Sequence, residues 1–313
     1  MSAERTSLDG GRWHWQHGPI DIVVQAEGDA SVLAQAHEAA WQRFAGILDE
    51  LVMELRALRR PVSEPQQLQG PIARRMWHAC TDASHACGSP FITPMAAVAG
   101  SVAQELIAFY NRPGIERAWI NNGGDIALHL AAGQEARVGV FADLARFDPM
   151  LHKGPLETDG QFDVRADTPV RGIATSGWRG RSFSLGIADS VTVLAATAAQ
   201  ADAAATLIAN AVDVDDAAIR RLPASQCKDD SDLGDIPVTV DVAPLAPTQV
   251  QHALAAGVLC ARMLQRAGLI WSAALVCQGQ WRVVQPLSSL PASDGAALPS
   301  MPLQGHAVGS VFA

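Results

Sequence analysis

A carboxylate and a hydroxyl stand four positions apart in residues 201–206, where the chain reads Ala-Asp-Ala-Ala-Ala-Thr. The alanine-rich composition favours a helix, and side chains at i and i+4 share one helix face about a turn apart. Asp202 and Thr206 would then present two hard oxygen ligands of the kind that Mg²⁺ combines with substrate phosphates. The alternative is structural: Asp202 helps to cap a helix that begins near Thr197, and Thr206 bonds back to the helix backbone.

A second polar set stands at the end of an apolar stretch that predicts a strand. Thr175, Ser176 and Gly177 end that strand, and hydroxyls and free backbone amides at such a turn can converge on a phosphate. Arg179 and Arg181 come directly after it, and guanidinium groups bind phosphate oxygens bidentately. The sequence therefore predicts an anion site here, and the alternative is a solvated basic turn.

The third set is a turn formed by Asn122, Gly123, Gly124 and Asp125. Two successive glycines permit positive φ and let a ligand approach the backbone. The carboxylate of Asp125 is an acceptor for a ribose hydroxyl, a ring N–H or another loop. The same four residues also form an ordinary hairpin turn that needs no ligand. Each of the three sets therefore has an adequate structural explanation on its own.

A further cluster lies in residues 74–87. On a helix, His78, Asp82 and His85 share one face with ligand-like spacing for a transition metal, although no cysteine falls well on the same stripe. The alternative is an ordinary helix surface. The chain contains no Gly-x-Ser-x-Gly elbow, Walker A, His-Glu-x-x-His or Gly-x-Gly-x-x-Gly string. The sequence therefore does not support a standard serine nucleophile, zinc site or dinucleotide-binding motif.

Composition limits the classes of function. The chain has 313 residues, and its 23 Lys and Arg against 32 Asp and Glu give a net charge of −9, which disfavours nucleic acid and anionic membrane as partners. No apolar run is long enough to span a bilayer, and residues 1–10 show neither a secretory signal nor a lipid anchor. Five cysteines without a CxxC pair are typical of a reducing compartment, so we expect a cytoplasmic protein.

Hydrophobic periodicity predicts the elements that must position these residues. Alternating patterns predict strands at 13–15, 20–25, 117–121, 126–130, 137–141, 171–175, 190–196, 237–242, 269–277 and 281–285. Apolar residues that recur three and four positions apart predict helices at 29–60, 72–86, 95–110, 198–212 and 248–267.

The order of these elements predicts an α+β fold. The same order of elements, namely strands, then two helices, then strands, occurs in both halves of the chain. This order suggests an internal duplication of the pattern, without a residue-by-residue repeat. We therefore expect an N-terminal half at 1–150 and a C-terminal half at 151–286. Residues 287–313, rich in Ser, Pro, Gly and Ala, read as a weakly ordered tail.

Taken in order, four segments resemble the ApbE superfamily, which contains the magnesium-dependent FAD:protein FMN transferases. These are Asn-Gly-Gly-Asp at 122–125, Ile-Ala-Thr-Ser-Gly at 173–177, Ser-Val-Thr-Val at 190–193 and Ala-Asp-Ala-Ala-Ala-Thr at 201–206. Residues 94–100 and 180–190 look like a shorter, uncharacterised cytoplasmic branch. The ordered set is far more specific than any one segment.

The resemblance implies a fold and a site. The fold is a tandem of β-hairpin, two-helix, β-hairpin (T-fold-like) units packed together. The helix motif would supply the metal ligands Asp202 and Thr206. If the chain is a Mg²⁺-dependent transferase, the ion and Arg179 or Arg181 would stabilise charge that develops on phosphate oxygens. The residues around the bound FAD would be Asn122, Gly123, Gly124, Asp125, Thr175, Ser176 and Gly177.

This chain also departs from the transferases. It lacks their His-Ile-x-Asp-Pro-x-Thr-Gly stretch after the Thr-Ser-Gly turn and the lysine of a Gly-Ile-Ala-Lys-Gly stretch. The first hypothesis is a Mg²⁺-dependent transferase that moves FMN from FAD to an acceptor protein. The alternatives are a non-catalytic module that binds a flavin, nucleotide or pterin, and an enzyme of pterin-type one-carbon metabolism.

Overall fold

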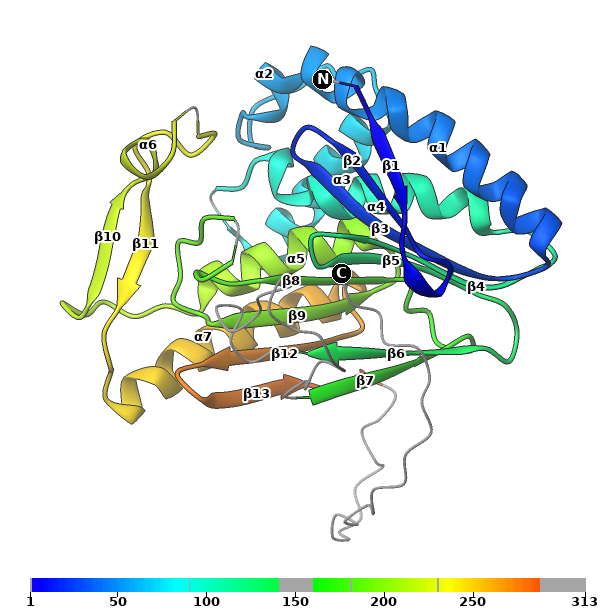
Figure 1. Ribbon diagram of the computed structural model, residues 1–313. Helices are drawn as coiled ribbons and strands as arrows, with labels where there is room; N and C mark the ends of the chain where they lie inside the picture. The colour runs from blue at the N-terminus through cyan, green and yellow to red at the C-terminus, as the bar shows by residue number, and fades with distance from the viewer. Residues whose placement is uncertain (1, 90, 141–159, 181, 230, 288–313) are drawn as a thin grey trace, which may run out of the picture.

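One antiparallel sheet of nine strands forms the centre of the structure (Figure 1). The computed structural model describes residues 2–89, 91–140, 160–180, 182–229 and 231–287. In sheet order the strands are β1 (Glu4–Ser7), β2 (Trp13–His17), β3 (Ile20–Gly28), β4 (Ile115–Asn122), β5 (Asp125–Leu130), β8 (Gly172–Ser176), β9 (Ser190–Ala195), β12 (Ser272–Cys277) and β13 (Gln280–Val284). The sheet thus joins strands from both ends of the described chain.

Helices pack on one face of this sheet (Figure 1). They are α1 (Ala30–Met53), α2 (Leu55–Leu58), α3 (Pro71–Cys87), α4 (Val98–Ile107), α5 (Ala198–Ala211) and α7 (Pro247–Arg266). In α1 the buried side chains include Ala36, Ala40, Phe44 and Ile47, at spacings of three and four, so one stripe of the helix faces the sheet. Burial of this stripe holds the helix against the core, and half-buried side chains such as Leu33, Trp41 and Leu48 pack along its edges.

Alternation along the central strands divides the core between the two faces of the sheet. Ile120 of β4 packs under the helices, whereas its neighbour Trp119 points to the opposite face. That face is covered by a two-stranded sheet of β6 (Glu135–Val140) and β7 (Gly160–Arg165), whose Val138 and Val164 join the cluster around Trp119. The central strands are therefore covered on both faces.

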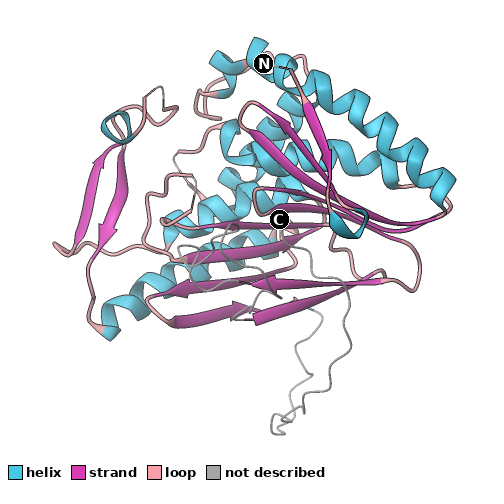
Figure 2. Cartoon of the chain, viewed as in Figure 1, coloured by secondary structure: helices cyan, strands magenta, loops and turns pink. Residues whose placement is uncertain are grey.

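A smaller unit extends from the C-terminal part of the sheet (Figure 2). It consists of β10 (Ile219–Pro223), the short helix α6 (Ala224–Cys227) and β11 (Pro237–Val242), which pairs with β10. The hydroxyl of Thr93 donates to Asp232 Oδ2 at 2.7 Å, and this bond ties the unit to the segment before α4.

The predicted α+β class is confirmed by the antiparallel sheet and its covering helices. The helix expected at 29–60 is interrupted: α1 ends at Met53, and Glu54 leaves the helical conformation before α2 begins. The sheet does place the hairpin β2–β3, the hairpin β4–β5, the pair β8–β9 and the hairpin β12–β13 side by side. The duplication and the division at residue 150 stay predictions, and the tail beyond residue 287 lies outside the described residues.

In the part of the chain that the structure describes, none of the helices combines the length and the hydropathy that a membrane span requires.

Candidate functional site

The first predicted ligand, Asp202, lies on α5 directly beneath the first turn of α4. Its Oδ2 accepts a hydrogen bond from the amide of Gly100 at 2.8 Å, and the amide of Ala99 also bonds to the carboxylate. These amides belong to the first turn of α4, which has no partners for them within its own helix. Asp202 therefore caps α4 from a different helix.

The alternative interpretation, in which Asp202 caps the start of α5, is wrong. Thr197 holds that position, and its hydroxyl accepts from the amide of Gln200 at 3.3 Å. The carboxylate is free to reach α4 because Gly100 has no side chain. A Cβ on Gly100 would stand 2.3 Å from the carbonyl oxygen of Ala198 and 2.9 Å from Asp202 Cβ, which no side chain tolerates.

Burial sets the charge state of this carboxylate. Asp202 is 9% exposed, and desolvation raises its pKa from 3.8 to about 7, although the amides of Gly100 and Ala99 act in the opposite direction. Burial, and then the charge of Asp202, raise the pKa of the Cys80 thiol. The ionised form of this carboxylate is therefore disfavoured near neutral pH. A cation bound beside it would stabilise that form.

The glycine turn is joined to the same point of α4. Asn122, at the end of β4, donates from Nδ2 to the carbonyl oxygen of Ala99 at 3.1 Å. Gly123 and Gly124 have φ of +66° and +109°, and the amide of Gly124 donates to Oδ1 of Asn121 at 2.8 Å. A Cβ added at Gly124 would meet nothing within 4 Å, so the turn borders open space.

The Thr-Ser-Gly turn lies beside the glycine turn. Strand β8 pairs with β5, and the amide of Thr175 donates to Oδ1 of Asp125 at 3.3 Å. The hydroxyls of Thr175 and Thr192 are 3.0 Å apart. One hydrogen-bonded series thus runs from α5 through the start of α4 and the turn between β4 and β5 to β8 and β9, and it joins all three polar sets predicted from the sequence.

Two predicted residues of the loop make close contacts within the chain. A Cβ on Gly177 would stand 2.4 Å from the carbonyl oxygen of Asp189, so the glycine is required by close packing of the chain against itself. Arg179 Nε lies 3.8 Å from Asp189 Oδ1, and its guanidinium lies 4.8 Å from the ring centroid of Trp178. Arg181 lies outside the described residues.

The remaining predicted ligands differ in their surroundings. Thr206 is half-buried one turn beyond Asp202 on α5. His78, Asp82 and His85 are all exposed on α3. Within the described part of the chain, no group of three or more His, Cys, Asp or Glu side chains is arranged to hold a metal ion.

The structure adds residues that the sequence did not single out as site residues. Asp189 is only 7% exposed and accepts hydrogen bonds from Trp178 Nε1 at 3.3 Å and from the amide of Gln278. A signal did exist in the sequence, because Asp189 is a single carboxylate between the apolar pair Ile187 and Ala188 and the predicted strand at 190–196. Gly100 had a weaker signal, a glycine inside a run of small residues.

Comparison with curated proteins finds relatives that are themselves described only as UPF0280 proteins. One from Methanospirillum hungatei is 36% identical over 126 residues, which is 40% of this chain and 47% of that protein. One from Methanopyrus kandleri is 32% identical over 207 residues, which is 64% of this chain and 75% of that protein. The match with the first of these spans about half the length of the relative.

Solved structures of low sequence identity were also found. The ApbE protein from Thermotoga maritima is 12% identical with a TM-score of 0.49, covering 91% of this chain and 98% of that one. The Pseudomonas stutzeri flavinyl transferase ApbE, in its apo form, is 11% identical with a TM-score of 0.45, covering 90% of this chain and 93% of that one. A family model described as AbpE bacteria matches residues 4–283, which confirms the resemblance stated from the motifs. The chain belongs to that family.

Proposed function

We propose that this chain binds a flavin dinucleotide together with Mg²⁺ at the meeting point of α4, α5 and the two turns. The observation that carries the proposal is the hydrogen-bonded series from Asp202 through Gly100, Ala99 and Asn122 to the glycine turn. It brings a carboxylate and the glycine turn together from segments that lie far apart in the sequence.

The donor set fits Mg²⁺. Asp202 and Thr206 offer hard oxygens one turn apart on a single helix, and Mg²⁺ is commonly bound by one or two protein oxygens together with waters and substrate phosphates. Bound there, the ion would supply positive charge to the phosphate oxygens of the ligand. The buried carboxylate favours this arrangement, because a cation compensates the cost of ionising Asp202 away from water.

The turns fit the ligand side of the site. Gly124 has a left-handed φ and open space where a side chain would stand, so a phosphate or a ring can approach the backbone there. Ser176 is half-buried at the end of β8, next to the strand that begins at Asp125. Arg179 is exposed and extends the anion-binding surface, with its charge shared with Asp189.

The test is a titration of the purified chain with FAD, followed by flavin fluorescence, in Mg²⁺ and in EDTA. We expect saturable binding that weakens at least tenfold in EDTA. Thr206→Val should weaken binding only when Mg²⁺ is present, because it removes a proposed ligand and leaves the bond between Asp202 and Gly100 in place. Thr248→Val, which changes an exposed threonine in the first turn of α7, is the matched control and should bind as wild type. Equal FAD affinity with and without Mg²⁺ would contradict the proposal.

Family membership favours a second candidate, the transfer of FMN from FAD to a protein hydroxyl. In that reaction a Ser or Thr oxygen forms a bond to the phosphorus of the FMN half, the pyrophosphate bond breaks, and AMP leaves while the hydroxyl proton is released. AMP release and covalent flavin fluorescence on an acceptor protein would be measured together. Tight binding of FAD without AMP release across candidate acceptors selects the binding module.

A further inference from the structure

Two thiols from distant parts of the chain meet between α3 and α7. All five cysteines are free thiols, and the side chains of Cys87 and Cys260 hydrogen bond to each other. Cys87 is the last residue of α3, and Cys260 lies in the middle of α7, which packs against α3. The contact therefore joins two helices that are separated by more than half of the sequence.

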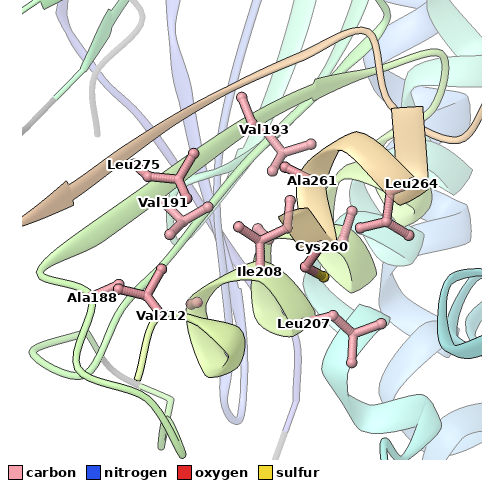
Figure 3. Packing of buried hydrophobic residues seen from close by; sticks show 14 of the residues in the cluster. Ala188, Val191, Val193, Leu207, Ile208, Val212, Cys260, Ala261, Leu264 and Leu275 are labelled. Atoms are coloured by element: carbon pink, nitrogen blue, oxygen red, sulfur yellow. The ribbon is translucent and has the colours of Figure 1, made fainter. Parts of the chain in front are cut away.

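The two thiols have different surroundings. Cys87 is half-buried, and it also has a backbone hydrogen bond with Ser89. Cys260 is only 8% exposed and belongs to the core cluster between α5, α7 and the sheet, where Figure 3 shows it beside Leu207 and Ile208. The hydrogen bond from Cys260 is the main reason that the pKa of Cys87 is lowered, whereas the pKa of Cys260 is raised by the same contact and by burial.

We propose that Cys87 and Cys260 are a redox-sensitive pair that forms a reversible disulfide when the protein meets a hydroperoxide. Cys87 is the attacking thiol because it is the more exposed of the two, and Cys260 is the resolving thiol because it already touches Cys87. This assignment is independent of the proposed nucleotide site. It is consistent with a reducing compartment, in which disulfides are transient and serve sensing or catalysis.

The chemistry balances with the hydroperoxide as the two-electron oxidant. The Cys87 thiolate attacks an oxygen, the O–O bond breaks, and Cys87 becomes a sulfenic acid while the alcohol or water leaves with a proton. The sulfur of Cys260 then attacks the sulfenic sulfur. The S–S bond forms, the S–O bond breaks, and the oxygen leaves as water with the proton of Cys260. A thiol reductant reverses the net reaction by disulfide exchange.

A disulfide at this place would link the two helices that flank the candidate site. α5, which carries Asp202 and Thr206, packs against both α3 and α7. α3 is followed by the segment that leads into the first turn of α4. A bond between Cys87 and Cys260 would therefore close a covalent loop through the helix layer and restrict the motion of α3 relative to α7.

The experiment treats the reduced, full chain with one equivalent of hydrogen peroxide. We expect the intact mass to fall by two hydrogen atoms, a peptide joining Cys87 to Cys260 in a non-reducing digest, and a rise in the thermal unfolding midpoint that a thiol reductant reverses. In Cys260→Ser the sulfenic acid on Cys87 should persist and be trapped by a cyclic 1,3-dione. Cys227→Ser removes the exposed cysteine and should behave as wild type.

The outcome that overturns the proposal is equally specific. Oxidised wild type that yields no Cys87–Cys260 peptide, or a dione adduct no stronger in Cys260→Ser than in Cys87→Ser, would show that the thiols do not react as a pair. Circular dichroism of each variant establishes that it is folded. A variant that fails to fold is replaced by the corresponding alanine substitution, and the peptide from wild type decides the question without any variant.

Discussion

Replacing Asp202 with asparagine should stabilise the metal-free protein at neutral pH and have little effect in acid. Asparagine keeps an oxygen that can accept the amide of Gly100, but it removes the buried charge. Burial raises the pKa of Asp202 from 3.8 to about 7, so the protonated carboxyl favours the folded state. The stabilisation by the protonated carboxyl of wild-type Asp202 is fully present below pH about 4 and is lost as the pH rises to about 7.

The magnitude follows from that difference in pKa. At about 1.4 kcal/mol per pH unit, ionising Asp202 in the folded protein costs up to about 4 kcal/mol relative to the unfolded chain. This cost already includes the opposing effect of the amides at the start of α4, which stabilise the ionised carboxylate. We therefore predict that Asp202→Asn is more stable than wild type by about 4 kcal/mol at pH 7.5 and by about 1 kcal/mol at pH 4.5.

Urea unfolding of both proteins in EDTA, followed by tryptophan fluorescence at pH 4.5, 6 and 7.5, measures the difference directly. A variant that is destabilised at pH 7.5, or a difference that does not change with pH, would refute the reasoning. It would mean that the amides of α4 outweigh desolvation at this carboxylate. Adding Mg²⁺ at pH 7.5 tests the metal separately, since the ion should stabilise wild type and leave Asp202→Asn unchanged.

Two further substitutions test the packing and the hydrogen bonds around the site. Gly100→Ala places a Cβ 2.3 Å from the carbonyl oxygen of Ala198, so we expect a loss of about 3 kcal/mol in unfolding free energy, whereas Gly46→Ala on α1, where nothing lies within 4 Å, should stabilise by about 0.5 to 1 kcal/mol. Equal effects of the two alanines in urea would contradict the close approach of α4 to α5. Thr192→Val removes the hydroxyl 3.0 Å from that of Thr175 and should cost about 1 kcal/mol, measured by thermal unfolding; no loss would mean that water replaces the bond.

Much of the fold could be predicted from local sequence pattern. The apolar stripe at Ala36, Ala40, Phe44 and Ile47 has helical spacing, and it determines both that α1 is a helix and which face is buried. Strand β1 could not be predicted in the same way, because all four of its residues are exposed and it has no apolar alternation. It forms only because β2 offers an unpaired edge.

The sequence by itself also determined which residue types were available for a site, and it placed Asp202 and Thr206 one turn apart because that distance is fixed by the helix. The tertiary structure alone decided their surroundings. The bond between Asp202 and Gly100 joins residues 102 positions apart, and it depends on how α4 packs over α5. The contact between Cys87 and Cys260 likewise depends on helix packing. Local spacing determines neighbours within an element, whereas sheet register and close approach at glycine determine neighbours between elements.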